Sequence, residues 1–151
     1  MLVVLVLLAG ILNAGEPEEI PQKFSARIGG MLGSTFRVEL SGRTLEYSVT
    51  RRRETSAPVK VTPTAEQWRE FRKALDEVNV WRWKSDYLNR RVMDGTQWSL
   101  DIAYADRSIK AAGSNSYPDD KGKANGQPQF TPAFARYLAA VEKLLGGKTF
   151  K

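Results

Sequence analysis

The strongest constraint on the fold is a strict alternation of apolar and polar residues over 36–49. Apolar side chains occupy every second position of 36–40 and again of 45–49, and the turn sequence Ser-Gly-Arg at 41–43 separates the two runs. A period of two places alternate side chains on opposite faces of a strand. The pattern therefore predicts an antiparallel hairpin with one dry face and one solvated face.

An amphipathic helix is predicted directly after this hairpin. Thr64 and Gln67 have the spacing of a capping box, which satisfies free N–H groups at a helix start. Apolar residues then recur at helical spacing, at Trp68, Phe71, Leu75 and Val78. Asn79 is the predicted stop.

The second half of the chain follows the same plan. Residues 98–104 alternate, a turn is predicted at 105–107, and a return strand passes through Ile109 and Ala111. Thr131 and Pro132 supply an N-cap and a first-turn proline. The helix they start carries an apolar stripe and ends at a glycine pair; these residues are Phe134, Leu138, Val141, Leu145, Gly146 and Gly147.

These elements predict an α+β fold: an antiparallel sheet of about four or more strands with two helices on one face. Residues 36–40 and 98–102 share one pattern, down to an acidic residue on the wet face. Two ββα repeats made by duplication, and two similar units of independent origin, both fit this observation. Short additional strands are expected at 24–28 and 80–83.

The N-terminal sequence predicts export. Residues 2–12 are uncharged and almost wholly apolar, and small residues follow at 14–15. Such a run is typical of a signal peptide and is shorter than the roughly 20 residues that cross a bilayer. We therefore interpret 1–15 as a signal peptide and 16–151 as one α+β domain, secreted or periplasmic. A buried N-terminal strand or helix is the alternative.

The composition excludes several catalytic chemistries. The chain has no histidine and no cysteine, which removes Ser-His-Asp triads, thiolate nucleophiles, disulfides and cysteine zinc sites. A Ser–Lys pair such as Ser108 and Lys110, or a carboxylate pair, remains chemically open. We expect no cofactor and no bound metal, and a non-catalytic role is favoured.

The first candidate site lies in an aromatic segment. Trp81, Trp83 and Tyr87 are interleaved with cations, and Arg90 and Arg91 follow. Aromatic rings next to cations stack on sugars or bases and pair with anions. Core packing explains the same aromatics and is the favoured interpretation, since Trp81 and Trp83 would share one face of a strand.

The second candidate is the small, polar segment 113–118, which contains Asn115 and Tyr117. Asp119 and Asp120 follow and could offer oxygen atoms to a hard cation. An ordinary turn is the competing interpretation, because turns use these residue types. A rigid, protruding loop here would instead indicate an inhibitor of a secreted enzyme.

The third candidate is the basic surface. The formal net charge is +6, and Arg51, Arg52 and Arg53 are consecutive. The charge favours an anionic polymer, or an envelope protein, as the partner. No nucleic-acid-binding motif accompanies it, which argues against specific nucleic-acid recognition.

Two motifs resemble a family. The run 94–100 has the form D-G-x-x-W-x-L, and 113–118 has the form G-S-N-x-Y-P. In these motifs the chain resembles small uncharacterised bacterial secreted proteins. That resemblance implies a bacterial envelope setting and carries over no activity and no site residue.

Taken together, the sequence leaves the function unknown and favours an exported, non-catalytic binding or interaction domain of the cell envelope. The alternatives are a small hydrolase with Ser–Lys or carboxylate chemistry, and an inhibitor of a secreted enzyme. A deep pocket with convergent titratable groups would favour the hydrolase, whereas a flat or basic surface would favour binding.

Overall fold

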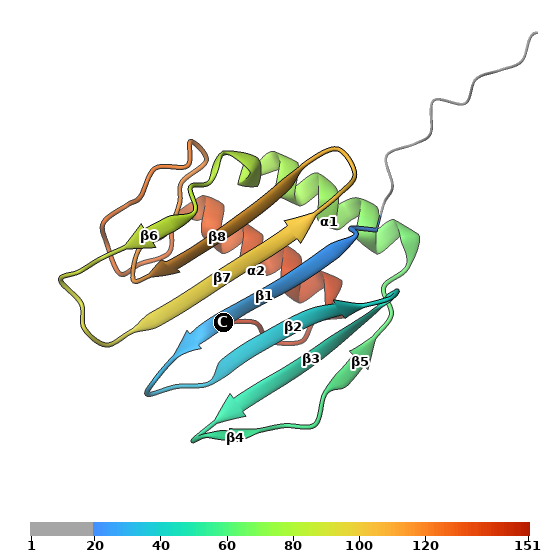
Figure 1. Ribbon diagram of the computed structural model, residues 1–151, viewed down its shortest axis with the longest axis horizontal. Coiled ribbons are helices and arrows are strands. Elements are labelled where there is room, and N and C mark those ends of the chain that lie inside the picture. The colour runs from blue at the N-terminus through green and yellow to red at the C-terminus, as the bar shows by residue number, and fades with distance from the viewer. Residues whose placement is uncertain (1–19) are drawn as a thin grey trace, which may run out of the picture.

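A computed structural model describes residues 20–151, so the predicted signal peptide at 1–15 lies outside the described residues. Within 20–151 the chain forms a mixed sheet of eight strands and two α-helices, which confirms the predicted α+β class. Both helices lie against the same face of the sheet (Figure 1). The strands are β1 (Lys23–Gly30), β2 (Thr35–Ser41), β3 (Thr44–Arg51), β4 (Glu54–Thr55), β5 (Val59–Val61), β6 (Asp86–Leu88), β7 (Thr96–Ala103) and β8 (Ser108–Ser114).

Strand β1 is the centre of the sheet. The strand order is β4-β3-β2-β1-β7-β8-β6, and β5 pairs with β3. The short strand expected at 24–28 is therefore the element that joins the two predicted hairpins. Its alternate residues Phe24, Ala26 and Ile28 are buried, which gives β1 one dry face and one open face.

The two hairpins pair with β1 in equivalent registers. Ile28 lies opposite Phe36 on one side and Trp98 on the other, and Ala26 lies opposite Val38 and Leu100. The shared sequence pattern thus matches a shared partner strand.

The hairpins are nevertheless mirror-related. Strands β2 and β7 both run antiparallel to β1, their return strands β3 and β8 lie on opposite outer sides, and the same face is buried in both. No rotation superimposes two hairpins related in this way. The order hairpin, connection, helix is present in each half, but this arrangement favours similar patterns without duplication.

The two edges of the sheet were not foreseen. Strand β6 pairs with β8 in parallel, at Asp86 opposite Ala112 and Tyr87 opposite Gly113. The sheet is therefore mixed, and not purely antiparallel as predicted. The other edge carries the short strands β4 and β5, both of which pair with β3.

The helices begin where the sequence predicts. Helix α1 (Ala65–Glu77) has the complete capping box, with Thr64 N donating to Gln67 Oε1 at 2.8 Å and Gln67 N donating to Thr64 Oγ1 at 3.2 Å. Helix α2 (Pro132–Leu144) is capped by Thr131, whose Oγ1 accepts from Phe134 N at 3.1 Å. Among residues 20–151, no helix is long and apolar enough to span a membrane.

The prediction of a short strand at 80–83 is wrong. Asn79 adopts a left-handed conformation (φ 55°) just after α1, and the chain then makes a 3-10 turn at Val80–Arg82. The left-handed residue reverses the chain against the end of α1, because a helix that ends in this way turns sharply. Trp81 and Trp83 therefore do not share one strand face.

Candidate functional site

Two of the three aromatic residues in the first candidate site lie in the core between sheet and helices. Trp83 and Tyr87 are buried. The Trp83 ring centroid lies 5.9 Å from that of Trp98 and 5.4 Å from that of Tyr137. The Tyr87 hydroxyl accepts from Lys84 N and donates to Gly122 O, both at 2.8 Å. The structure thus gives these two aromatics packing partners, as the favoured interpretation expected.

Trp81 is half-buried in a cluster whose charged groups are paired with one another. The Arg72 guanidinium lies 5.0 Å from the Trp81 ring centroid and 4.4 Å from that of Tyr104. Arg72 also donates two hydrogen bonds to Asp106, at 3.1 and 2.8 Å. These bonds lower the pKa of Asp106 from its ordinary value to about 2. Trp81 Nε1 donates to Asp76 Oδ1 at 2.6 Å. The cation and the ring are therefore already paired within the molecule.

The segment 113–118 is buried and does not protrude. The Asn115 side chain accepts from Thr96 N at 2.9 Å, and it packs so closely on Gly95 that a Cβ there would lie 2.0 Å from Asn115 Oδ1. Tyr117 is buried, with its ring 4.9 Å from Phe134. The feature that would have indicated an inhibitor loop is absent from this segment.

The two sequence motifs interlock across the strands β7 and β8. Trp98 Nε1 donates to Ser116 O at 3.0 Å. Gly113 lies under the Trp98 ring, where a Cβ would be 2.3 Å from Nε1. Close packing thus explains the glycines, the tryptophan and the asparagine of the two motifs. These residues have a role in the fold.

The remaining predicted residues are exposed. Arg90 and Arg91 lie in the connection between β6 and β7, at one end of the sheet. Ser108 and Lys110 are exposed on β8, with Lys110 opposite Asp101 of β7. Asp119 Oδ1 accepts from Lys121 N and Lys123 N, both at 2.8 Å, within a tight turn.

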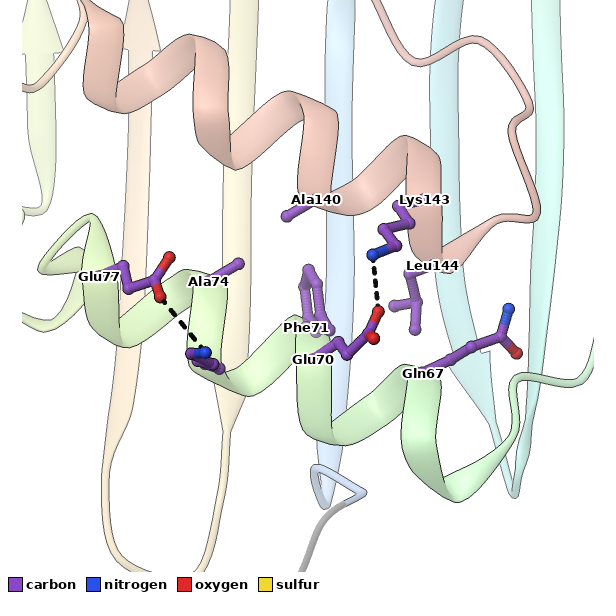
Figure 2. Close-up of a pocket in the computed structure, with 9 residues that line it drawn as sticks. Gln67, Glu70, Phe71, Ala74, Glu77, Ala140, Lys143 and Leu144 are labelled. Carbon is purple, nitrogen blue, oxygen red and sulfur yellow. Dashed lines mark ion pairs between the residues drawn. The ribbon is translucent and has the colours of Figure 1, made fainter.

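A groove between the two helices pairs its own charges (Figure 2). Lys143 of α2 contacts Glu70 of α1 at 2.7 Å, and Lys73 contacts Glu77 at 4.0 Å. The hydrogen bond from Lys143 lowers the pKa of the Glu70 carboxyl. Because its cations and carboxylates neutralise each other, the groove offers no unmatched charge to a ligand.

The open face of the sheet has the opposite character. Arg27 of β1 lies directly opposite Arg37 of β2, and both side chains are exposed on the face away from the helices. Arg37 contacts Glu39 at 3.0 Å, whereas Arg27 makes no ion pair with any of residues 20–151. Like charges directly opposite each other destabilise a sheet. The pair is therefore a feature that folding alone does not favour.

A second feature that is unfavourable for folding, a loop with two positive φ angles, lies next to the Arg27–Arg37 pair. The two-residue loop between β3 and β4 consists of Arg52 and Arg53, with φ of 47° and 71°. Hairpin loops of this kind favour Asn and Gly, since a Cβ disfavours positive φ. Arg51 Nε donates to Ser34 Oγ at 3.1 Å and ties this loop to the turn between β1 and β2.

These arginines surround one concave region, which we call the basic hollow: Arg27, Thr35, Arg37, Thr50, Arg52, Arg53 and Gln97. Two contiguous depressions of about 570 and 490 Å³ share Arg27, Thr35 and Thr50. Glu39 and Glu46, which lie opposite each other on β2 and β3, also line the smaller depression. The hollow can offer guanidinium and hydroxyl donors to anionic groups, the chemistry that binds phosphate and sulfate.

Arg27 and Arg37 were not among the site residues predicted from the sequence. Each is an ordinary wet-face residue in its own strand, and their juxtaposition depends on the register of β1 with β2. The alternation alone could have found it, once 24–28 was recognised as the neighbour of 36–40.

No group of three or more His, Cys, Asp or Glu side chains placed to hold a metal ion occurs within residues 20–151. Comparisons with models of known protein families and with curated proteins find no match to this chain. The basic hollow is therefore the candidate site on the strength of its own geometry and charge.

Proposed function

We propose that the protein is an exported, non-catalytic binding domain that recognises an anionic partner through the basic hollow. The observation that carries this proposal is the direct opposition of Arg27 and Arg37 on the open face. An anionic group placed between two guanidiniums replaces their repulsion with two charge-assisted interactions. The apolar segment at 2–12 supports export.

The surroundings of the pair support a binding role over catalysis. The larger depression offers arginine, threonine and glutamine side chains, which donate hydrogen bonds but supply no general base near neutral pH. The smaller depression adds the carboxylates of Glu39, which pairs with Arg37, and of Glu46. Its shape is an open depression on a sheet, which suits an extended or surface-bound anion. Ser108 and Lys110 lie farther along the open face, on β8.

The proposal is tested with heparin as a polyanionic probe, across a salt series. We compare the wild type with Arg27→Gln/Arg37→Gln and with a control, Arg43→Gln/Arg136→Gln. Both double variants lower the formal charge of +6 by the same two units. Arg43 lies in the turn between β2 and β3, and Arg136 is an exposed residue of α2.

We expect wild-type affinity to fall steeply with salt, and the Arg27/Arg37 variant to lose a salt-dependence slope of about 2. The control should stay close to the wild type. Equal losses in both double variants would show a response to net charge and contradict a defined site. Negligible heparin binding by the wild type at low salt would overturn the proposal.

A further inference from the structure

One end of the sheet carries large apolar side chains in solvent. Met31 and Leu32, in the turn between β1 and β2, are 85% and 92% exposed, and Met93, in the connection between β6 and β7, is 96% exposed. The pairing of Gly30 with Thr96 brings these two segments to the same end, and Figure 1 shows them beyond the arrow tips of β1 and β6. We call these three residues the apolar tip.

The three tip side chains project into solvent, and the two in the turn between β1 and β2 border a depression of about 490 Å³. Glycines at 29–30 and 33 flank Met31 and Leu32, and a Cβ at Gly33 would meet no atom within 4 Å. Protein partners usually recognise apolar anchors by enclosing them in shaped pockets. A bilayer accepts protruding apolar side chains without any shaped counterpart, and each buried methylene contributes about 0.8 kcal/mol.

Arginines border the tip. Arg52 and Arg53 lie in the loop between β3 and β4, and Arg90 and Arg91 lie in the same connection as Met93. None of these four makes an ion pair with residues 20–151, although the acidic Asp94 lies next to Met93. Met31 itself lines the basic hollow together with Arg27. Apolar side chains with adjacent cations are the pattern that binds anionic membrane surfaces.

We propose that this end of the sheet docks on an anionic lipid surface, with Met31, Leu32 and Met93 entering the interfacial layer. The arginines of the basic hollow then contact lipid headgroup phosphates. This inference rests on the proposed function, because it names the anionic partner of the same hollow.

The test uses single-cysteine variants of the full chain, which has no cysteine of its own. Gly33→Cys places an environment-sensitive fluorophore at the tip and leaves its three apolar residues intact. Ala105→Cys, exposed in the turn between β7 and β8 at the opposite end, is the matched control. A position-specific label separates docking of the tip from any attachment through the apolar segment 2–12.

With phosphatidylglycerol vesicles we expect a blue shift and quenching by lipid-borne quenchers for the label at 33, and neither for the label at 105. Pure phosphatidylcholine vesicles should give no shift. Leu32→Ser/Met93→Ser, two tip residues that do not line the basic hollow, combined with the label at 33, should weaken vesicle binding by about tenfold or more and leave heparin affinity unchanged.

The possible failures are distinguishable. An unshifted label at 33 in a chain that binds heparin would overturn the lipid inference and point to a soluble polyanion or a protein as the partner. A shift at 105 equal to that at 33 would overturn the docking geometry. Loss of heparin binding as well would overturn both proposals.

Discussion

Two regions of this molecule contain arginines near aromatic or apolar side chains, and they differ in how those arginines are satisfied. Around Trp81, Arg72 is held by Asp106 and by two aromatic rings. On the open face, Arg27 lies opposite another arginine. In the region that looks more like a binding site in sequence, the charge of Arg72 is thus already matched by carboxylates. Unmatched charge, and not residue type, identifies the candidate site.

The two regions also differ in how they affect the stability of the fold. The aromatic region is built from close packing, with Gly113 and Gly95 admitting neighbouring side chains. The basic hollow combines like-charge opposition with a loop of positive-φ arginines. Variants of the first region should therefore lose stability, whereas variants of the second should gain stability and lose binding.

The largest expected effect is in the packed region, at Gly113→Val. A Cβ there would lie 2.3 Å from Trp98 Nε1 and 2.9 Å from Ser116 O, so side chain and backbone must both move. We expect the free energy of unfolding to fall by about 3 kcal/mol or more, as in overpacked cores, measured by urea denaturation.

Gly33→Val is the control for this variant, because a Cβ at Gly33 meets open space. It should change the free energy of unfolding by less than about 1 kcal/mol. If both variants were equally stable, the packed region would be pliable and the contrast between the two regions would fail.

The second prediction concerns the loop of the basic hollow. Arg52→Asn/Arg53→Gly installs the residues that a loop with two positive φ angles prefers. We expect the free energy of unfolding to rise by about 1–2 kcal/mol, and heparin affinity to fall. Arg43→Asn is the control, since Arg43 is not among the positive-φ residues. Unchanged stability in the loop variant would show that the loop holds no strain.

Local features of the fold could be predicted from sequence because their causes are local. The Thr64–Gln67 box and the Thr131 cap depend on residues three apart, and each hairpin turns within a few residues. The course of the chain after Asn79 could not be predicted, since the same aromatic spacing fits a strand or a turn. A left-handed residue decided between them.

The candidate site was not predicted, because it depends on which strands are neighbours and on their register. Arg27 and Arg37 are ten residues apart, and only the register of β1 with β2 sets them side by side. The apolar tip likewise joins residues 31–32 to residue 93 through the pairing of β1 with β7. Sequence reasoning correctly found Arg52 and Arg53 as basic, but not that their loop borders the same hollow.

The smallest expected effect tests whether Asp106 is paired with Arg72 in the cluster around Trp81. The pKa of Asp106 is lowered to about 2 from an ordinary 3.8. A lowered pKa contributes stability that is fully present above the ordinary value and is lost as pH falls through the lowered one. Part of the acid-induced loss of stability between about pH 4 and pH 2 should therefore come from Asp106. In Asp106→Asn that loss should be shallower, by a small amount because the pair is exposed.

Urea denaturation at a series of pH values measures this difference, with the exposed Asp120→Asn as the control. Arg72 should keep both carboxylate partners in the control, whereas in Asp106→Asn only Asp76, 3.3 Å from Arg72 Nε, should remain. If the two variants showed the same pH dependence, Asp106 would not be holding Arg72. Asp76 alone would then hold the guanidinium next to the half-buried Trp81 ring, and the aromatic segment would again compete with the basic hollow as the binding surface.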